Sequence, residues 1–248
     1  ARGVLARAAL VLVVSEGAAD DVAARGVPSE RIVVRGLGFP DPASIPPPDG
    51  TLRASIGVGA DEPLALSVGR IASGKGIEHL VAAARELPGL HVALVGPDDR
   101  HGAMTVLDDA RRDPLLSGRI HALPPTDGPP LGLYGEADVF VLGSDGDSFG
   151  LVAAEAAAAG TPVVVTDRCG IATFFDEGEA LVVPARRDAI VDAIRRVLGE
   201  ASLARELAAG GLAAARRNTW ERATDVQEEA YRTTASRTAA TKLSLDGS

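Results

Sequence analysis

The sequence predicts an α/β protein with a doubly wound, parallel, Rossmann-like sheet. Short β-branched segments alternate with longer segments rich in Ala, Leu and Arg through the middle of the chain, and this alternation is typical of parallel strands joined by crossover helices. The 248 residues are 46% hydrophobic, so the chain can bury a substantial core. Six strands in such a succession commonly take the order 3-2-1-4-5-6, which places the first and fourth strands side by side.

The strands of this sheet are expected at six apolar runs: LALSVG, HVALVG, RIHAL, DVFVLG, PVVVT and ALVVP, at residues 64–69, 91–96, 119–123, 138–143, 162–166 and 180–184. The helices are expected to begin near Gly76, Gly102, Leu131, Gly150 and Ile171, with two more near Arg187 and Ser202. One helical segment follows each strand, as a doubly wound sheet requires, and the segment near Ser202 is a further helix at the end of the sheet domain.

The chain is expected to divide into four parts: residues 1–40 as the remnant of a preceding domain, 41–60 as a linker, 61–218 as the sheet domain and 219–248 as a C-terminal helix with a polar, disordered tail. The first part carries a further strand at 11–15, a short helix to about residue 25 and a strand at 31–36. The Pro-rich run GFPDPASIPPPDG separates it from the sheet and indicates the linker.

Composition narrows the possible partners and the compartment. The net charge of −9 argues against nucleic acid or an anionic membrane as the main partner, since both would meet repulsion over most of the surface. No uninterrupted apolar run reaches the roughly 18 residues of a membrane span, and no signal peptide is recognised. Cys169 is the only cysteine, and the four histidines show no metal-ligand spacing, so a cytoplasmic protein without a bound metal is expected.

The first candidate site follows the first predicted strand. Gly69 and Arg70 end that strand, and Lys75, one of only two lysines in the chain, stands between Gly74 and Gly76 at the start of a helix. Glycines that admit close backbone approach, two cations and a helix N-terminus together predict a diphosphate site. The alternative is a tight turn with solvated charges, and the spacing does not match a Walker loop.

The second candidate site follows the fourth predicted strand. Asp147 precedes a helix, and Glu155 lies inside it among Ala and Val residues. A carboxylate in such surroundings needs a partner, and it suits the vicinal diol of a ribose. The alternative for Asp147 and Ser148 is simple N-capping. Because ligands of open α/β sheets bind at the switch between strands one and four, Arg70, Lys75, Asp147 and Glu155 are expected to converge there.

Several segments together give the chain a resemblance to a known family: SVGRIASGKGIEHL, HVALVGPDD, YGEADVFVLGS, DSFGLVAAEAAAAGTPVVVTDRCGI and ALVVPARRDAI. They resemble glycosyltransferase family 4, the retaining enzymes of the two-domain GT-B fold. The resemblance implies that Arg70 and Lys75 hold the donor's diphosphate, that Asp147 contacts the donor sugar, and that Glu155 binds the ribose. It also implies that the backbone near Gly69, Ser148, Phe149, Gly150 and Leu151 contacts the donor, with Arg70, Lys75 and Asp147 as the catalytic residues.

The resemblance implies transfer of a hexose from a UDP-, GDP- or ADP-sugar to an acceptor hydroxyl, with retention of configuration and with neither metal nor cofactor. Two departures stand out: the family usually has Glu where this chain has Asp147, and the N-terminal acceptor domain is absent apart from residues 1–40. We therefore expect the isolated chain to bind donor but to transfer sugar poorly, and the base, sugar and acceptor stay open.

Other interpretations use the same residues. The chain could be a non-catalytic nucleotide-sugar-binding module or a subunit that acts with a separate acceptor-domain partner. A ligand-free scaffold is disfavoured because four charged site positions are present, and an epimerase would need a catalytic acid and base that the sequence does not show. The segment from Thr219 onward resembles the family's last helix, which packs on the N-terminal domain. Without the rest of that domain, part of the apolar surface would be left exposed, which predicts self-association or a partner there; this surface comprises Trp220, Tyr231 and the apolar face of residues 1–15.

Overall fold

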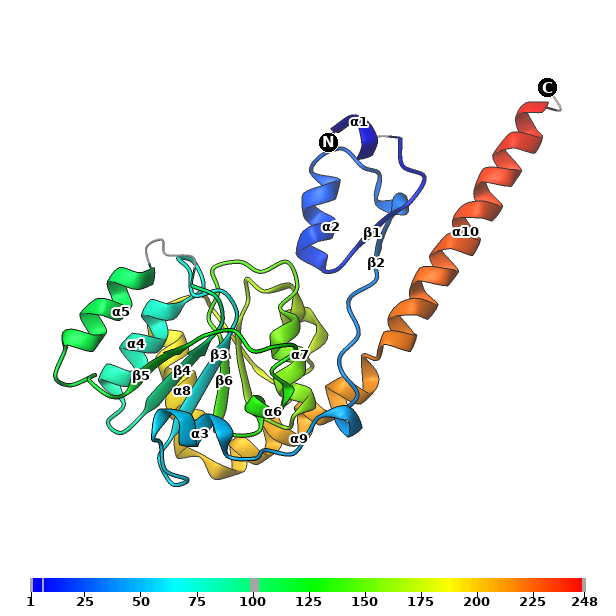
Figure 1. The fold of residues 1–248 in the computed structure, drawn as a ribbon. Coiled ribbons are helices and arrows are strands. Elements are labelled where there is room, and N and C mark those ends of the chain that lie inside the picture. Colours follow the sequence, from blue (N-terminus) through cyan, green and yellow to red (C-terminus); the bar gives the residue numbers. More distant parts are fainter. Residues whose placement is uncertain (1, 6, 99–102, 247–248) are drawn as a thin grey trace.

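A six-stranded parallel sheet organises the main body of the chain (Figure 1). The computed structural model describes residues 2–5, 7–98 and 103–246. The strands are β3 (Leu64–Val68), β4 (His91–Val95), β5 (Ile120–Leu123), β6 (Val139–Leu142), β7 (Val163–Thr166) and β8 (Leu181–Val183). Their order is β5-β4-β3-β6-β7-β8, which is the predicted 3-2-1-4-5-6 counted from β3. The predicted fold class is confirmed, and β3 pairs with β6 through Ala65–Val139 and Leu66–Phe140.

Alternating residues of the strands build two apolar clusters, one on each face of the sheet. Leu64 and Leu66 of β3 point to the face covered by α7 (Leu151–Ala158), α6 (Leu131–Tyr134) and α9 (Ala201–Arg217). Ala65 points to the opposite face, which is covered by α4 (Ile77–Glu86), α8 (Arg187–Gly199) and α5 (Ala103–Arg112). The strands are predominantly apolar because both faces of the sheet are covered.

Most expected helices occur where they were predicted, with one difference in type. The segment expected to be helical near Ile171 forms only a short 3-10 helix, η3 (Gly170–Phe174), because it has few residues between β7 and β8 and ends on an extended Phe175. Gly102, predicted as a helix start, lies outside the described residues, which resume with α5.

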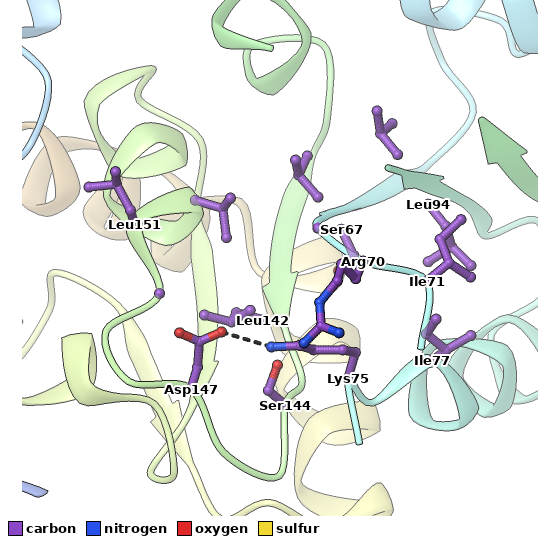
Figure 2. A pocket seen from close by; sticks show the side chains of 15 residues that line it. Ser67, Arg70, Ile71, Lys75, Ile77, Leu94, Leu142, Ser144, Asp147 and Leu151 are labelled. Atoms are coloured by element: carbon purple, nitrogen blue, oxygen red, sulfur yellow. Dashed lines mark hydrogen bonds and ion pairs between the residues drawn. The ribbon is translucent and has the colours of Figure 1, made fainter. Parts of the chain in front are cut away.

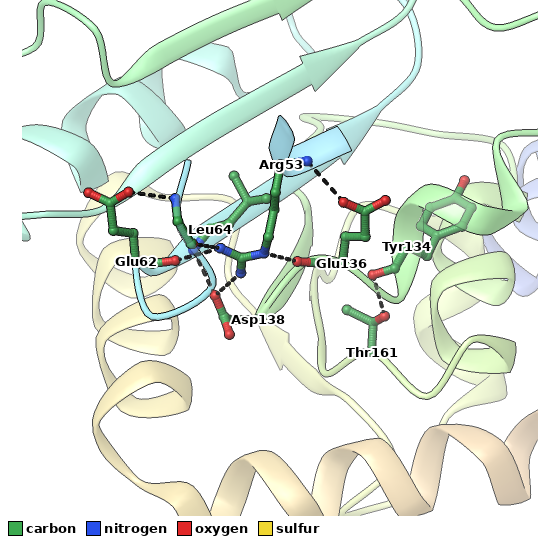
Figure 3. A network of polar contacts seen from close by, with 8 residues as sticks. Arg53, Glu62, Leu64, Tyr134, Glu136, Asp138 and Thr161 are labelled. Carbon is green, nitrogen blue, oxygen red and sulfur yellow. Dashed lines mark hydrogen bonds and ion pairs between the residues drawn. The ribbon is translucent and has the colours of Figure 1, made fainter. Parts of the chain in front are cut away.

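Residues 41–60, expected to form a linker, contain a 3-10 helix, η2 (Pro42–Ser44), and the helix α3 (Thr51–Ile56). Glu136 holds α3 on the sheet (Figure 3). Its carboxylate is almost fully buried and accepts hydrogen bonds from the backbone N–H groups of Leu52 (3.1 Å) and Arg53 (2.9 Å), which are unpaired donors in the first turn of α3. The sequence reasoning did not identify this contact, because it joins segments 84 positions apart.

The Arg53 guanidinium completes the attachment of α3. It donates to the Glu136 carbonyl oxygen at 2.8 Å and to the Asp138 carboxylate at 2.9 Å. Asp138 also accepts a hydrogen bond from the backbone N–H of Leu64, the first residue of β3 (Figure 3). These contacts tie α3 to the amino ends of β3 and β6, the edge of the sheet opposite to the candidate site.

The N-terminal residues form a separate parallel pair, β1 (Val11–Val13) with β2 (Ile32–Val34), flanked by α1 (Arg2–Leu5), α2 (Glu16–Ala23) and the 3-10 helix η1 (Ser29–Arg31). The last helix, α10 (Trp220–Asp246), extends away from the sheet on the side of this pair (Figure 1). Trp220 and Tyr231 are 44% and 52% exposed.

The prediction of a disordered polar tail is wrong within the described residues, since α10 continues to Asp246. Part of the reason is local bonding along the helix. Glu228 and Arg232, four residues apart on one face of α10, form an ion pair at 2.8 Å, and such pairs stabilise a helix. Among the described residues, no helix is both long and apolar enough to cross a membrane.

Candidate functional site

A cavity of about 220 Å³ lies at the carboxyl ends of β3 and β6, where the strand order reverses direction (Figure 2). The residues that line it are Ser67, Val68, Gly69, Arg70, Ile71, Lys75, Ile77, Leu94, Val95, Leu142, Ser144, Asp147, Gly150, Leu151 and Val152. Open parallel sheets bind ligands at this topological position. The cavity therefore joins the two candidate sites predicted from the sequence.

The glycine before α4 lets the two loops meet. Gly76 has φ of 72°, and a Cβ atom there would lie 2.1 Å from the carbonyl oxygen of Gly143. The backbone N–H of Asp145 also donates to the carbonyl oxygen of Gly74 at 3.0 Å. Only glycine tolerates this approach without strain. The loop that carries Lys75 is thereby packed directly on the loop that carries Asp147.

Lys75 and Asp147 form an ion pair across these loops (Figure 2). The Lys75 Nζ atom lies 2.9 Å from Oδ2 of Asp147, and the two side chains are 23% and 26% exposed. The other carboxylate oxygen, Oδ1, accepts a hydrogen bond from the backbone N–H of Phe149 at 3.2 Å. The capping alternative for Asp147 and Ser148 is wrong, because Gly150 is the N-cap residue of α7 and no side chain caps that helix.

Arg70 lies on the wall of the cavity with its guanidinium near the Lys75 side chain (Figure 2). Within the described part of the chain, no hydrogen bond or ion pair engages this guanidinium. The N-terminus of α4 adds partial positive charge beside it, and its N-cap residue Gly76 supplies no side-chain acceptor. Two cations and a helix N-terminus thus border one cavity, which suits an anionic ligand.

Glu155 does not line this cavity, so the expected convergence of four charged side chains is met by three of them. Its carboxylate faces α6, where the Tyr134 hydroxyl donates to Oε2 at 2.5 Å. Glu155 follows the cavity residues Leu151 and Val152 by four and three positions, which places it on the same helix face one turn deeper. The spacing along α7 thus separates the Glu155 carboxylate from the cations.

The partner expected for Glu155, which is partly buried, is Tyr134. Burial raises the pKa of Glu155, and the Tyr134 hydrogen bond opposes that rise. Burial also raises the pKa of Tyr134, with a further contribution from the Glu155 charge. No sequence pattern assigned a role to Tyr134, although it is one of only two tyrosines and a buried tyrosine hydroxyl usually has a partner.

The other predicted donor residues fall into two groups. Gly69, Gly150 and Leu151 line the cavity. Phe149 is buried instead, with its ring centroid 5.2 Å from that of Phe174, and Ser148 faces a different hollow, next to Cys169 and Ser15. Ser144 lines the cavity and was not predicted. Across the described residues, no group of three or more His, Cys, Asp or Glu side chains could hold a metal ion.

Comparison with protein families identifies the chain. The family model of glycosyl transferases group 1 matches residues 49–212, which include the whole cavity. This chain belongs to that family. The resemblance to GT-B glycosyltransferases found in the sequence is thereby confirmed.

Relatives of this group 1 family member share both sequence and fold with it. A D-inositol 3-phosphate glycosyltransferase of Xylanimonas cellulosilytica is 34% identical over 239 residues, which cover 92% of this chain and 57% of that protein. A sucrose-phosphate synthase from Thermosynechococcus elongatus has a similar structure, with a TM-score of 0.79 at 29% identity. The match covers 95% of this chain and 61% of the synthase chain.

A crystal structure of Anabaena Alr3699/HepE in complex with UDP has the same fold, with a TM-score of 0.78 at 21% identity, over 92% of this chain and 64% of that chain. The chain thus spans between 57% and 64% of the length of these three proteins.

Proposed function

We propose that this chain is the donor-binding half of a retaining, family 4 glycosyltransferase, which transfers a hexose from a nucleoside diphosphate sugar to an acceptor hydroxyl. The observation that carries the proposal is the cavity at the switch point, where Lys75, the N-terminus of α4 and an Arg70 guanidinium without a partner among the described residues meet. UDP is the first nucleotide to test, because Anabaena Alr3699/HepE, which shares this fold, holds UDP in its crystal structure.

Arg70 and Lys75 have electrostatic roles in this proposal. Diphosphate gains negative charge as the bond to the sugar breaks, and preorganised cations stabilise that charge, with about 3 kcal/mol lost when one such donor is removed. The protein's own cations and helix dipole supply this stabilisation, so the proposal requires neither a metal nor a cofactor. Lys75 must exchange its present partner, the Asp147 carboxylate, for the diphosphate.

Asp147 then becomes available to the donor sugar. Once Lys75 turns to the diphosphate, Oδ2 of Asp147 can accept a hydrogen bond from a sugar hydroxyl, while Oδ1 stays on the Phe149 backbone. Aspartate is one methylene shorter than the glutamate usual in family 4, so this contact would draw the loop toward the sugar. The identity of the hexose depends on this contact.

Glu155 is proposed to bind the ribose one turn deeper on α7. Tyr134 engages Oε2, which leaves Oε1 to accept a hydrogen bond from a ribose hydroxyl. Such a ribose would extend from the diphosphate along the face of α7 that carries Leu151 and Val152. Tyr134 would hold the carboxylate in the required orientation.

The isolated chain is proposed to bind donor without efficient transfer, because the relatives are longer by a half or more and would place the acceptor on the additional part. The second candidate is a non-catalytic module or subunit that acts with a separate acceptor-domain partner, and self-association through the exposed Trp220 and Tyr231 belongs to the same proposal. The proposed location is the cytoplasm, where nucleotide sugars are available.

Isothermal titration calorimetry with UDP, GDP and ADP tests the donor site. We expect one of them to bind the wild-type chain and to bind Lys75→Ala roughly 10- to 100-fold more weakly, as for a lost charged hydrogen bond. Arg111→Ala is the matched control, since Arg111 is exposed on α5 and its ion pair among the described residues is a local one with Asp108. Binding that is unchanged in Lys75→Ala would show that the donor site lies elsewhere.

An assay of sugar transfer separates the two candidates. Binding without transfer, with activity restored by a second protein, favours a subunit of a split enzyme, whereas binding that no partner converts into transfer favours a module. Efficient transfer by the 248-residue chain alone would overturn the proposal that it needs an acceptor domain.

A further inference from the structure

Ser144 carries a buried hydroxyl that has no hydrogen-bond partner among the described residues. The residue is 0% exposed, and its Oγ atom makes no hydrogen bond. Buried side-chain oxygens are nearly always paired, because an unpaired one loses its hydrogen bonds to water on folding. Within the described residues, Thr234 is the one other residue with such an atom, and it lies on α10, away from this cavity.

The Ser144 hydroxyl belongs to the donor cavity. Ser144 lines it, and Figure 2 shows the side chain directed toward the pair formed by Lys75 and Asp147. The backbone of Ser144 is held in place by β7, because the hydroxyl of Thr166, the last residue of that strand, donates to the Ser144 carbonyl oxygen at 2.6 Å. Gly143, the residue before Ser144, packs closely against Gly76 at the N-terminus of α4, so this helix end also lies next to Ser144.

The surroundings of this hydroxyl select the kind of atom that it would contact. A cation and a helix N-terminus attract an anionic ligand, so a hydroxyl beside them meets oxygens that accept hydrogen bonds. The Glu155 carboxylate, proposed to hold the ribose, lies one turn of α7 beyond the cavity residues Leu151 and Val152 and already accepts a hydrogen bond from Tyr134. The oxygens nearest to Ser144 in a bound donor would therefore be those of the diphosphate.

We propose that Ser144 is a further donor-binding residue, whose hydroxyl donates a hydrogen bond to a diphosphate oxygen held by Lys75. The proposal rests on the donor-site function given above and adds a residue to it. The hydroxyl is unpaired in the free chain and becomes paired when the nucleotide binds. Its burial excludes water from that hydrogen bond, which strengthens it.

Ser144→Ala tests the proposal by two independent measurements. Calorimetry should show that UDP binds about 10-fold or more weakly, as expected for a lost hydrogen bond to a charged group. NMR titration should show uridine, which lacks phosphates, binding equally to both proteins. The melting temperature of the free protein should stay the same or rise, because an unpaired buried hydroxyl is removed.

Two further variants control the test. Ser144→Cys nearly keeps the side-chain volume and substitutes a weak donor, so it should lose UDP affinity as Ser144→Ala does. Ser55→Ala removes a hydroxyl that bonds to the Leu52 carbonyl oxygen on α3, at the opposite edge of the sheet, and it should leave UDP affinity unchanged. GDP or ADP is the probe if either binds in place of UDP.

Each result bears on a different statement. If the wild-type chain binds the nucleotide and Ser144→Ala binds it equally well, the role of Ser144 is wrong while the donor site stands. A lower melting temperature with equal losses for UDP and uridine would show a structural hydroxyl bridged by water, which also overturns the role. If the wild-type chain binds none of UDP, GDP and ADP, the donor site is wrong and the role of Ser144 falls with it.

Discussion

Lys75 and Asp147 are separated by 72 positions in the sequence, yet the ammonium of one lies 2.9 Å from the carboxylate of the other. The pair bridges the loops that follow β3 and β6 (Figure 2). A diphosphate that binds at this cavity must compete with Asp147 for Lys75. In the free chain, the positive charge of Lys75 and the negative charge of Asp147 thus neutralise each other.

Asp147→Asn tests this competition. We expect UDP to bind at least as tightly as to the wild-type chain, because Lys75 loses its competing anion, while the additional affinity of a UDP-hexose over UDP falls. The ion pair is partly exposed, so the free energy of unfolding should fall by only about 1 kcal/mol or less. Calorimetry and urea denaturation measure these effects, and weaker UDP binding by the variant would contradict the competition.

Tyr134→Phe tests the support of Glu155. Removal of the hydroxyl leaves a partly buried carboxylate without its donor, and the free energy of unfolding should fall by about 1 to 2 kcal/mol at neutral pH. The pKa of Glu155 is already raised by burial and should rise further, so the cost should shrink as the pH falls and the carboxyl becomes protonated.

Glu155→Gln provides the comparison for Tyr134→Phe, since a neutral amide needs the tyrosine hydroxyl less. In the Glu155→Gln background, Tyr134→Phe should cost less stability than in the wild type. Chemical denaturation of the two single variants and the double variant gives the coupling free energy. A coupling near zero would show that the 2.5 Å contact contributes nothing.

Gly76→Ala tests the close packing of the two site loops. The new Cβ atom would lie 2.1 Å from the carbonyl oxygen of Gly143, and φ of 72° is unfavourable for alanine. We expect the free energy of unfolding to fall by more than about 2 kcal/mol. Gly199→Ala is the control, because nothing lies within 4 Å of its added Cβ atom, and it should be neutral or slightly stabilising.

His121 should make stability depend on pH. Its Nε2 atom lies 3.1 Å from Nδ1 of His91, and burial together with the His91 charge lowers the pKa of His121 below 6.5. The unfolded chain therefore binds a proton more readily than the native chain, so stability is full above about pH 6.5 and falls as the pH is lowered through that value.

His121→Gln should flatten this decline between about pH 7 and pH 5, which thermal denaturation across the pH range would show. His79→Gln, on α4 and away from the histidine pair, should retain the wild-type slope. An identical slope in His121→Gln and the wild type would assign the acid sensitivity to other groups.

Local patterns predicted the strands closely. The run predicted at 64–69 forms β3 (Leu64–Val68), and that predicted at 162–166 forms β7 (Val163–Thr166). A strand covered on both faces is a short, continuous apolar run that ends at a turn residue, and this signal needs no knowledge of distant contacts. The strand order was also predictable, because few connections are possible for alternating strands and helices.

Contacts between distant segments were harder to predict. The burial of Glu136 beneath α3 depends on two segments 84 positions apart, and nothing in the Pro-rich run around residues 38–50 indicates it. Glu155 was correctly expected to need a partner, yet its sequence neighbours do not reveal that α6 places Tyr134 across from it.

The sequence by itself determined the fold class and which residues reach the carboxyl edge of the sheet, because strand and helix periods are local properties of the backbone. The tertiary structure alone decided that Lys75 meets Asp147, that Glu155 turns to Tyr134, and that the Ser144 hydroxyl is left unpaired. These outcomes depend on distances between loops and helices, which packing sets to within a few tenths of an ångström and which no local pattern encodes.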